Sequence, residues 1–215
     1  MPGKKKLPAP PLTDSGELAS YAGDHLVYEV RMFFEGGAEL LAEQRRKMSA
    51  DAVTTATPSV MLGVPAKSWF LKMARIEAFV THYRNVVVFL FPDTHAVKSD
   101  DVCAHHFVSG SDPLGSWLSA RGSFSPKLKA AKARADKELA HLTTGRKAGV
   151  SKDKAWPVDD LTGELATVLE TFVATADPAS LGGMARRVIL QEVATYQGGA
   201  RLRWVPQSGR GADVP

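Results

Sequence analysis

Two side chains in the stretch RADKELAHLTTGR, residues 134–146, have the types and the spacing for acid–base chemistry on a phosphate. Arg134 and His141 are seven residues apart, so on a helix they return to nearly the same angular position two turns apart. A histidine exchanges protons near neutral pH, and an arginine binds a phosphate through two N–H groups and stabilises developing negative charge. The pair suits attack of a ribose 2′-hydroxyl on a phosphodiester, which needs no metal when these groups are supplied.

A surface interpretation of the same stretch stays open. Arg134 with Glu138, and Lys137 with His141, are also ordinary pairs four residues apart on a solvated helix face, and Arg146 is a normal basic residue at a helix C-terminus. If the stretch is a site, we expect Arg134 and His141 to be catalytic, with Lys137 and Arg146 as auxiliary or RNA-binding contacts. A third interpretation is a non-catalytic module that uses this flank for partner binding or dimerisation.

A second set of candidates lies on the segment KSWFLKMARIEAFVTHYRNVVVFLF, residues 67–91. Glu77 and Arg84, again seven residues apart, share one flank of its predicted helix. We expect them to face the helix that carries Arg134, either as a structural ion pair or as auxiliary site residues. His82 lies nearly opposite the apolar stripe, which predicts a surface or dimer-facing position.

The residue types of a metal site occur at Asp100-Asp101 and His105-His106, but on an irregular segment and without a ligand-spacing rule. We expect them to cap a short helix, and we predict no metal and no cofactor. The chain has one cysteine, Cys103, so it has no intramolecular disulfide. Nothing around Cys103 in the sequence favours a low thiol pKa, and we expect it to be buried.

The elements that would position these residues are helical. Apolar residues recur at helical spacing in four segments, for which we predict the helices 21–47, 67–91, 125–144 and 158–176. Gly36-Gly37 predicts a kink or a break in the first. Asp159 and Asp160 are expected to cap the start of the last. Residues 49–66 read as a connector, and 92–126 as irregular with Trp117 and Leu118 buried.

These helices predict an all-α protein, a helical bundle of four main helices with a C-terminal extension and flexible tails. We expect the bundle to span 19–178, between disordered tails at 1–18 and 205–215 that are poor in large apolar groups. The extension, 179–204, also matches a hairpin pattern around Gly198-Gly199. We favour a helix that breaks near Gly198.

Composition limits the function classes. The 215 residues are 44% hydrophobic and carry a formal net charge of +4, which permits an anionic partner without requiring one. The basic start of the chain has no apolar segment after it, and no run of about 18 apolar residues occurs. We therefore predict a cytoplasmic protein with no membrane association.

Three stretches carry a resemblance to a known family: RIEAFVTHYRNVVVFLFPD (75–93), the acidic pair at 100–101 followed by HHF, and RADKELAHLTTGR. Together they resemble an uncharacterised bacterial group similar to the HEPN superfamily of small, often dimeric helical bundles. Many of its members are metal-independent ribonucleases of toxin or defence systems, and their hallmark is an arginine and a histidine with four to six residues between them. Arg134 and His141 match this hallmark with six residues between them.

The resemblance implies a HEPN-like protein of a bacterial defence or toxin–antitoxin type system, with endoribonuclease activity. It also implies a homodimer, with RNA and an antitoxin or another protein as partners. Ala135 follows the arginine, where ribonuclease members usually carry a polar residue. Because inactive members of the superfamily act as binding or sensing modules, the alternative of a non-catalytic binding or dimerisation module remains.

Overall fold

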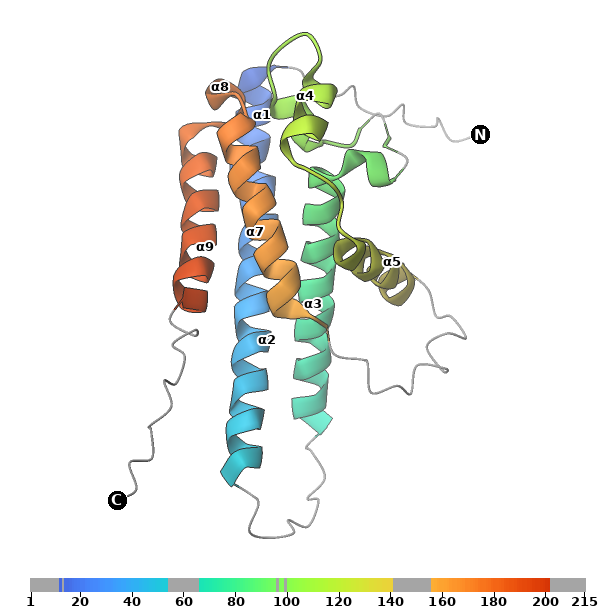
Figure 1. Cartoon of the computed structure of the whole chain (residues 1–215), viewed down its shortest axis with the longest axis vertical. Coiled ribbons are helices and arrows are strands. Elements are labelled where there is room, and N and C mark those ends of the chain that lie inside the picture. Colours follow the sequence, from blue (N-terminus) through green and yellow to red (C-terminus); the bar gives the residue numbers. More distant parts are fainter. Residues whose placement is uncertain are drawn as a thin grey trace, which may run out of the picture.

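The protein is an all-α helical bundle, which confirms the predicted fold class (Figure 1). The computed structural model describes residues 12, 14–53, 66–95, 97–98, 100–140 and 156–201, and these contain no strand. Long helices lie side by side along the long axis, with short ones grouped at one end. In chain order the α-helices are α1 (Ser15–Tyr21), α2 (Val27–Val53), α3 (Ala66–Leu90), α4 (Pro113–Ala120), α5 (Pro126–Ala140), α7 (Val158–Thr175), α8 (Pro178–Leu181) and α9 (Gly183–Arg201).

The first helical run is longer than predicted. Asp14 caps it, because its Oδ1 accepts hydrogen bonds from the backbone N–H groups of Gly16 and Glu17 at 2.8 and 3.1 Å. The predicted tail 1–18 is therefore wrong for residues 15–18, and Leu18 is buried in the core. Residues 1–11 lie outside the described part of the chain, as do 202–215.

A π-helical turn, η1 (Ala22–Leu26), joins α1 to α2 without a break. The N–H of Val27 donates to the carbonyl of Ala22, five residues earlier, which is the wider spacing of a π-helix. Single π turns inside α-helices are rare and frequently occur at functional sites.

Of the kink or break predicted at Gly36-Gly37, the break is wrong, because α2 continues through both glycines (Figure 1). A Cβ on Gly36 would lie 3.5 Å from the Cβ of Phe79 on α3, and one on Gly37 only 3.2 Å from the Oγ1 of Thr162 on α7. The two glycines therefore permit close packing of three helices. Burial at this crossing offsets the helix-propensity cost of about 1 kcal/mol per glycine.

α3 supplies the centre of the core. Its predicted stripe is buried at Val80, Tyr83 and Val87, and Phe79 packs its ring 5.5 Å from the ring of Phe33 on α2. His82 is also buried, so its predicted surface position is wrong. The imidazole lies between α3 and α2, where it bonds to Glu29.

The predicted irregular segment 92–126 contains the 3₁₀ helices η2 (Pro92–Thr94) and η3 (Ala104–Phe107), followed by α4. Asp112 caps α4 by accepting from the N–H of Gly115 at 2.9 Å. Trp117 is buried as predicted, and its indole N–H donates to the carbonyl of Leu90 at 2.8 Å. Leu118 is half-buried. α4 is thereby tied to the end of α3.

α7 buries its apolar face as predicted, through residues that include Leu161, Leu165 and Phe172. Asp159 and Asp160 lie in the first turn, where they complement the helix dipole as expected, but the N-cap position is occupied by Pro157, which makes no side-chain cap hydrogen bond. Asp160 also pairs with Lys127 of α5 at 2.9 Å. The acidic first turn thus tethers a neighbouring helix.

The C-terminal extension is helical, as favoured over the hairpin. α9 runs through Gly198 to Arg201 and packs against α2 and α7, so the expected break near Gly198 is wrong. Ala185, Ile189 and Val193 are buried in the same core as the rest of the bundle. α9 is consequently an integral helix of the bundle and not an appendage (Figure 1). No helix within the described ranges has the length and apolar character needed to cross a membrane.

Candidate functional site

α5 carries the predicted catalytic arginine and lies across the side of α3 (Figure 1). Its apolar seam is buried at Leu128, Ala131 and Ala135. The buried hydroxyl of Tyr83 donates to the carbonyl of Leu128 at 2.9 Å, so α3 holds the first turn of α5. This contact, with the burial of the seam, fixes the position of the helix flank.

Arg134 flanks the core, partly buried. The central carbon of its guanidinium lies 4.2 Å from the ring centroid of Trp156, in a cation–π arrangement. Trp156 is itself buried, just before α7. It falls in the segment 145–157, which carries no periodic pattern, so this contact could not be predicted from the sequence.

Arg84 faces α5, as the sequence predicted. Its Nε donates to Oδ1 of Asp136 at 2.7 Å, and Lys132 donates to Oδ2 of the same carboxylate at 2.9 Å. Burial acts to raise the pKa of Asp136, but the two cations outweigh it and hold that pKa below its ordinary value. Arg84 therefore serves a structural ion pair between α3 and α5. Glu77 is exposed on α3.

Of the other residues predicted for the site on α5, the structure describes Lys137 but not His141 or Arg146. Lys137 is exposed on the same helix as Arg134. His141 and Arg146 lie outside the described residues, which end on this side at Ala140. The juxtaposition of Arg134 with His141 therefore stays a prediction.

In the segment with Asp100-Asp101 and His105-His106, two of the four side chains accept hydrogen bonds from the backbone. His106 Nδ1 accepts the N–H of Cys103 at 3.2 Å, and Oδ2 of Asp101 accepts the N–H of Lys98 at 2.8 Å. Burial lowers the pKa of both His105 and His106, and for His105 the neighbouring His106 adds to the effect. Among the described residues, no group of three or more potential ligands could hold a metal ion.

Cys103 is buried, as predicted. Burial and then the charge of Asp101 raise the pKa of its thiol to about 11, which opposes formation of the reactive thiolate.

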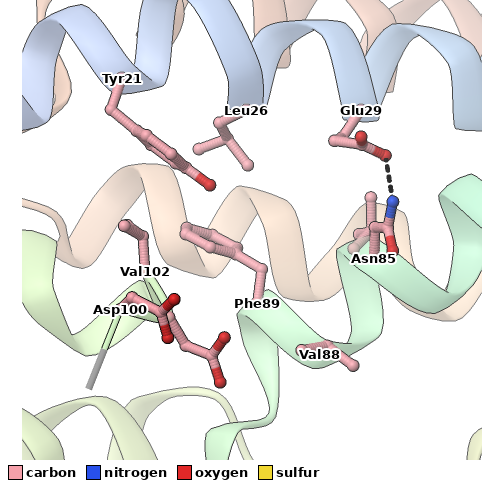
Figure 2. Close-up of a pocket in the computed structure, with 10 residues that line it drawn as sticks. Tyr21, Leu26, Glu29, Asn85, Val88, Phe89, Asp100 and Val102 are labelled. Atoms are coloured by element: carbon pink, nitrogen blue, oxygen red, sulfur yellow. Dashed lines mark hydrogen bonds between the residues drawn. The ribbon is translucent and has the colours of Figure 1, made fainter. Parts of the chain in front are cut away.

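A hollow of about 240 Å³ lies beside the π-helical turn, at a place the sequence did not indicate (Figure 2). Its walls come from α1, η1, α2, α3 and the segment at 100–102. The lining residues are Tyr21, Leu26, Glu29, Asn85, Val86, Val88, Phe89, Asp100, Asp101 and Val102. These residues lie far apart in the chain, so no spacing rule joins them.

Glu29 is the most constrained polar group of the hollow. Its Oε2 accepts a hydrogen bond from His82 Nδ1 at 2.7 Å. The same oxygen accepts a second one from Asn85 Nδ2 at 3.1 Å (Figure 2). A carboxylate only accepts, so the Nδ1 of His82 carries the proton in this bond. Both donors come from α3, which fixes the carboxylate at the edge of the hollow.

No family model, no curated protein and no solved structure matches this chain.

Proposed function

We propose that the protein is a HEPN-like helical bundle of a bacterial defence or toxin–antitoxin type system that cleaves RNA without a metal ion at the flank of α5. The observation that supports the proposal is the placement of Arg134, whose guanidinium lies 4.2 Å from the ring of Trp156. Stacking on an aromatic face holds the guanidinium plane and preserves its charge. A cation held in this way is suited to a phosphodiester, because its ordering cost is met before RNA binds.

His141 completes the proposed site. If α5 continues beyond Ala140 with helical geometry, His141 falls two turns after Arg134 on the same flank. The imidazole takes the proton of the ribose 2′-hydroxyl, and the 2′-oxygen then attacks phosphorus. The bond to the 5′-oxygen breaks, and that oxygen leaves with a proton returned by a general acid. The products are a 2′,3′-cyclic phosphate and a 5′-hydroxyl.

Arg134 acts in this proposal as the cation that stabilises the charge on the non-bridging oxygens in the transition state. Lys137, exposed on the same helix, and Arg146 are proposed to contact neighbouring phosphates. Arg84 is assigned a positioning role, because its guanidinium pairs with Asp136 and so ties α5 to α3. The proposed mechanism assigns no step to Glu77, which is exposed on α3.

The test is cleavage of structured and single-stranded RNAs by the purified full-length chain in EDTA. We expect metal-independent cleavage that leaves cyclic phosphate ends and is lost in His141→Ala. Arg134→Lys keeps the charge but not the planar guanidinium, and we expect cleavage to fall by about tenfold to a hundredfold. The matched control is His25→Ala, which removes an exposed histidine on η1, far from α5 in sequence.

Helicity and the urea midpoint of each variant separate loss of chemistry from loss of fold. Absence of cleavage, or cleavage that His141→Ala leaves unchanged while the fold is intact, would remove the ribonuclease proposal.

A second candidate, a non-catalytic dimerisation module, is favoured by a different observation. Phe70 and Leu71, adjacent on α3, are 65% and 47% exposed. Neighbouring large apolar side chains in solvent are typical of a surface that another protein covers. We expect Phe70→Ser to shift a dimer toward monomer in light scattering, while Leu114→Ser, which removes an exposed leucine on α4, leaves the mass unchanged. A monomeric wild-type chain would exclude this candidate.

A further inference from the structure

The hollow beside the π-helical turn combines an apolar wall with an acidic edge (Figure 2). Leu26, Val86 and Phe89 are buried residues that contribute the apolar wall. Glu29, Asp100 and Asp101 contribute three carboxylates from two separate parts of the chain, and none of the ten lining residues is Lys, Arg or His. A hollow of this kind favours a ligand that has both an apolar body and a positive charge.

Some carboxylate oxygens at this edge accept no hydrogen bond from a described residue. Both hydrogen bonds to Glu29 end on Oε2, and no described residue bonds to its Oε1. The Oδ2 of Asp101 accepts the N–H of Lys98, and no described residue bonds to its Oδ1. The hydroxyl of Tyr21 points into the space between Leu26 and Phe89 (Figure 2). Acceptors therefore remain for several N–H donors of one ligand.

The electrostatic field in the hollow is negative. Burial is the largest cause that raises the pKa of Tyr21, and the charges of Glu29 and Asp101 raise it further. The histidines in contact with the lining residues are His82, on Glu29, and His25, whose ring centroid is 5.1 Å from that of Tyr21. A cation in the hollow would gain from the negative charge of these carboxylates.

The arrangement of the carboxylates distinguishes an organic cation from a metal ion. No group of three carboxylate, histidine or cysteine side chains among the described residues comes close enough to hold a metal. The acidic groups are instead spread around a volume of about 240 Å³, below the range of about 300–1,000 Å³ of drug-sized pockets. A small ligand with several N–H donors can reach separated acceptors, whereas a bare metal ion cannot.

We propose that this hollow binds a small organic cation, an ammonium or amidinium group carried on a short apolar body. The charged group lies beside Asp100 and Asp101, the apolar body lies against Phe89 and its neighbours, and Glu29 adds negative charge from the α2 side of the hollow. The site is formed by the first helical run, α3 and the segment at 100–102, with no residue from α5. It is therefore independent of the proposed RNA cleavage.

The test is calorimetric titration of the full-length chain at pH 7 with benzylamine and benzamidine, both cations, against neutral benzyl alcohol. We expect the two cations to bind at least about tenfold more tightly than the alcohol, since the carboxylates attract a charged group more strongly than a neutral hydroxyl. In the double variant Asp100→Asn, Asp101→Asn we expect binding to weaken about tenfold, because the amides keep the hydrogen-bond acceptors but not the charge. Glu170→Gln is the matched control, an exposed carboxylate on α7 outside the hollow, and its affinity should equal that of the wild type.

Four outcomes would overturn the proposal. Neither cation binding at millimolar concentration would remove the site. Equal affinity of benzyl alcohol and benzylamine would show that the carboxylates do not select a cation. No effect of the double variant would show the same for Asp100 and Asp101. Displacement of benzylamine by CaCl₂ at micromolar concentration would assign the hollow to a metal ion.

Discussion

The imidazole of His82 is clamped against the carboxylate of Glu29, with Nδ1 of His82 2.7 Å from Oε2 of Glu29. His82 is 9% exposed, so this contact joins α3 to α2 inside the bundle. The same carboxylate oxygen accepts from Asn85 one turn further along α3, and the ring of Tyr28 packs edge-on against the imidazole. A polar contact of this kind fixes the relative rotation of the two longest helices at the edge of the hollow.

Replacement of His82 should therefore destabilise the bundle. His82→Ala removes the main partner of the half-buried Glu29 carboxylate and leaves a gap beside Tyr28. We expect the free energy of unfolding, measured by urea denaturation, to fall by about 2 kcal/mol. His25→Ala, at an exposed position, should change it by less than about 0.5 kcal/mol. Equal effects of the two substitutions would contradict the clamp.

Replacing a glycine by alanine should change the free energy of unfolding in opposite directions at two positions, Gly37 where α2 crosses α7 and Gly198 on α9. A Cβ on Gly37 would lie 3.2 Å from Oγ1 of Thr162, which is fully buried and bonded to the carbonyl of Val158, so it cannot easily move. Crowding then outweighs the helix-propensity gain, and Gly37→Ala should destabilise by about 1 kcal/mol. Gly198→Ala on α9 meets nothing within 4 Å and should stabilise by about 0.5 kcal/mol.

Urea denaturation of both variants beside the wild type checks the pair. A stabilising Gly37→Ala would mean that α2 and α7 separate without cost, and that the glycines are not there for close packing.

The sequence predicts the bounds of α3 and α7 well, because their apolar residues repeat with the helical period, whereas the predicted 21–47 falls short of the helical run from Ser15 to Val53 at both ends. The predicted 67–91 and 158–176 agree within a residue with Ala66–Leu90 and Val158–Thr175. Local rules failed where tertiary packing overrides propensity. Gly36-Gly37 predicts a kink or a break within a single helix, yet these glycines permit α3 and α7 to pack closely against α2. His82 lies off the apolar stripe of its own helix, and its burial depends on Glu29 from α2.

The candidate sites show the same limit. The angular position of Arg84 on its own helix predicts that it faces α5. It does not predict which of the charged residues of α5 is its partner, which the structure shows to be Asp136. The contact of Arg134 with Trp156 crosses from a periodic helix to a segment without a pattern. The hollow at the π-helical turn joins three distant parts of the chain, and helical periodicity relates residues only within one helix.

Cys103 should be chemically unreactive in the folded protein. Burial, with the charge of Asp101, raises its pKa from an ordinary 9.0 to about 11, so at pH 8 the thiolate fraction falls about a hundredfold. We expect alkylation by iodoacetamide at pH 8 to be at least about a hundredfold slower in buffer than in urea, and the native rate to keep rising between pH 9 and 11. Equal rates in buffer and urea would contradict the burial.

The Asp136 network gives a pH dependence with a defined sign. Burial alone would raise the pKa of Asp136, but hydrogen bonds from Lys132 and Arg84 lower it below 3.8 in the folded protein. As pH falls, the unfolded chain takes up the proton first, so the network's contribution is present above about pH 5 and is lost as pH falls through the folded pKa. The contribution is below about 1 kcal/mol, because Asp136 is 38% exposed and screened by solvent.

We therefore expect Asp136→Asn to be less stable than the wild type at pH 7 in urea denaturation, and the difference to shrink as pH approaches 3. The difference at pH 7 should also shrink in 1 M NaCl, since exposed ion pairs are screened by salt. Lys127→Met provides a comparison, because it removes the ion pair to Asp160 at the other end of α5 and leaves Asp136 intact. A difference between Asp136→Asn and the wild type that stays constant from pH 7 to pH 3 would mean that the carboxylate acts by packing and not by charge. In that case α5 would be held on α3 by Tyr83 and the apolar seam, and the position of Arg134 would not depend on ionic strength.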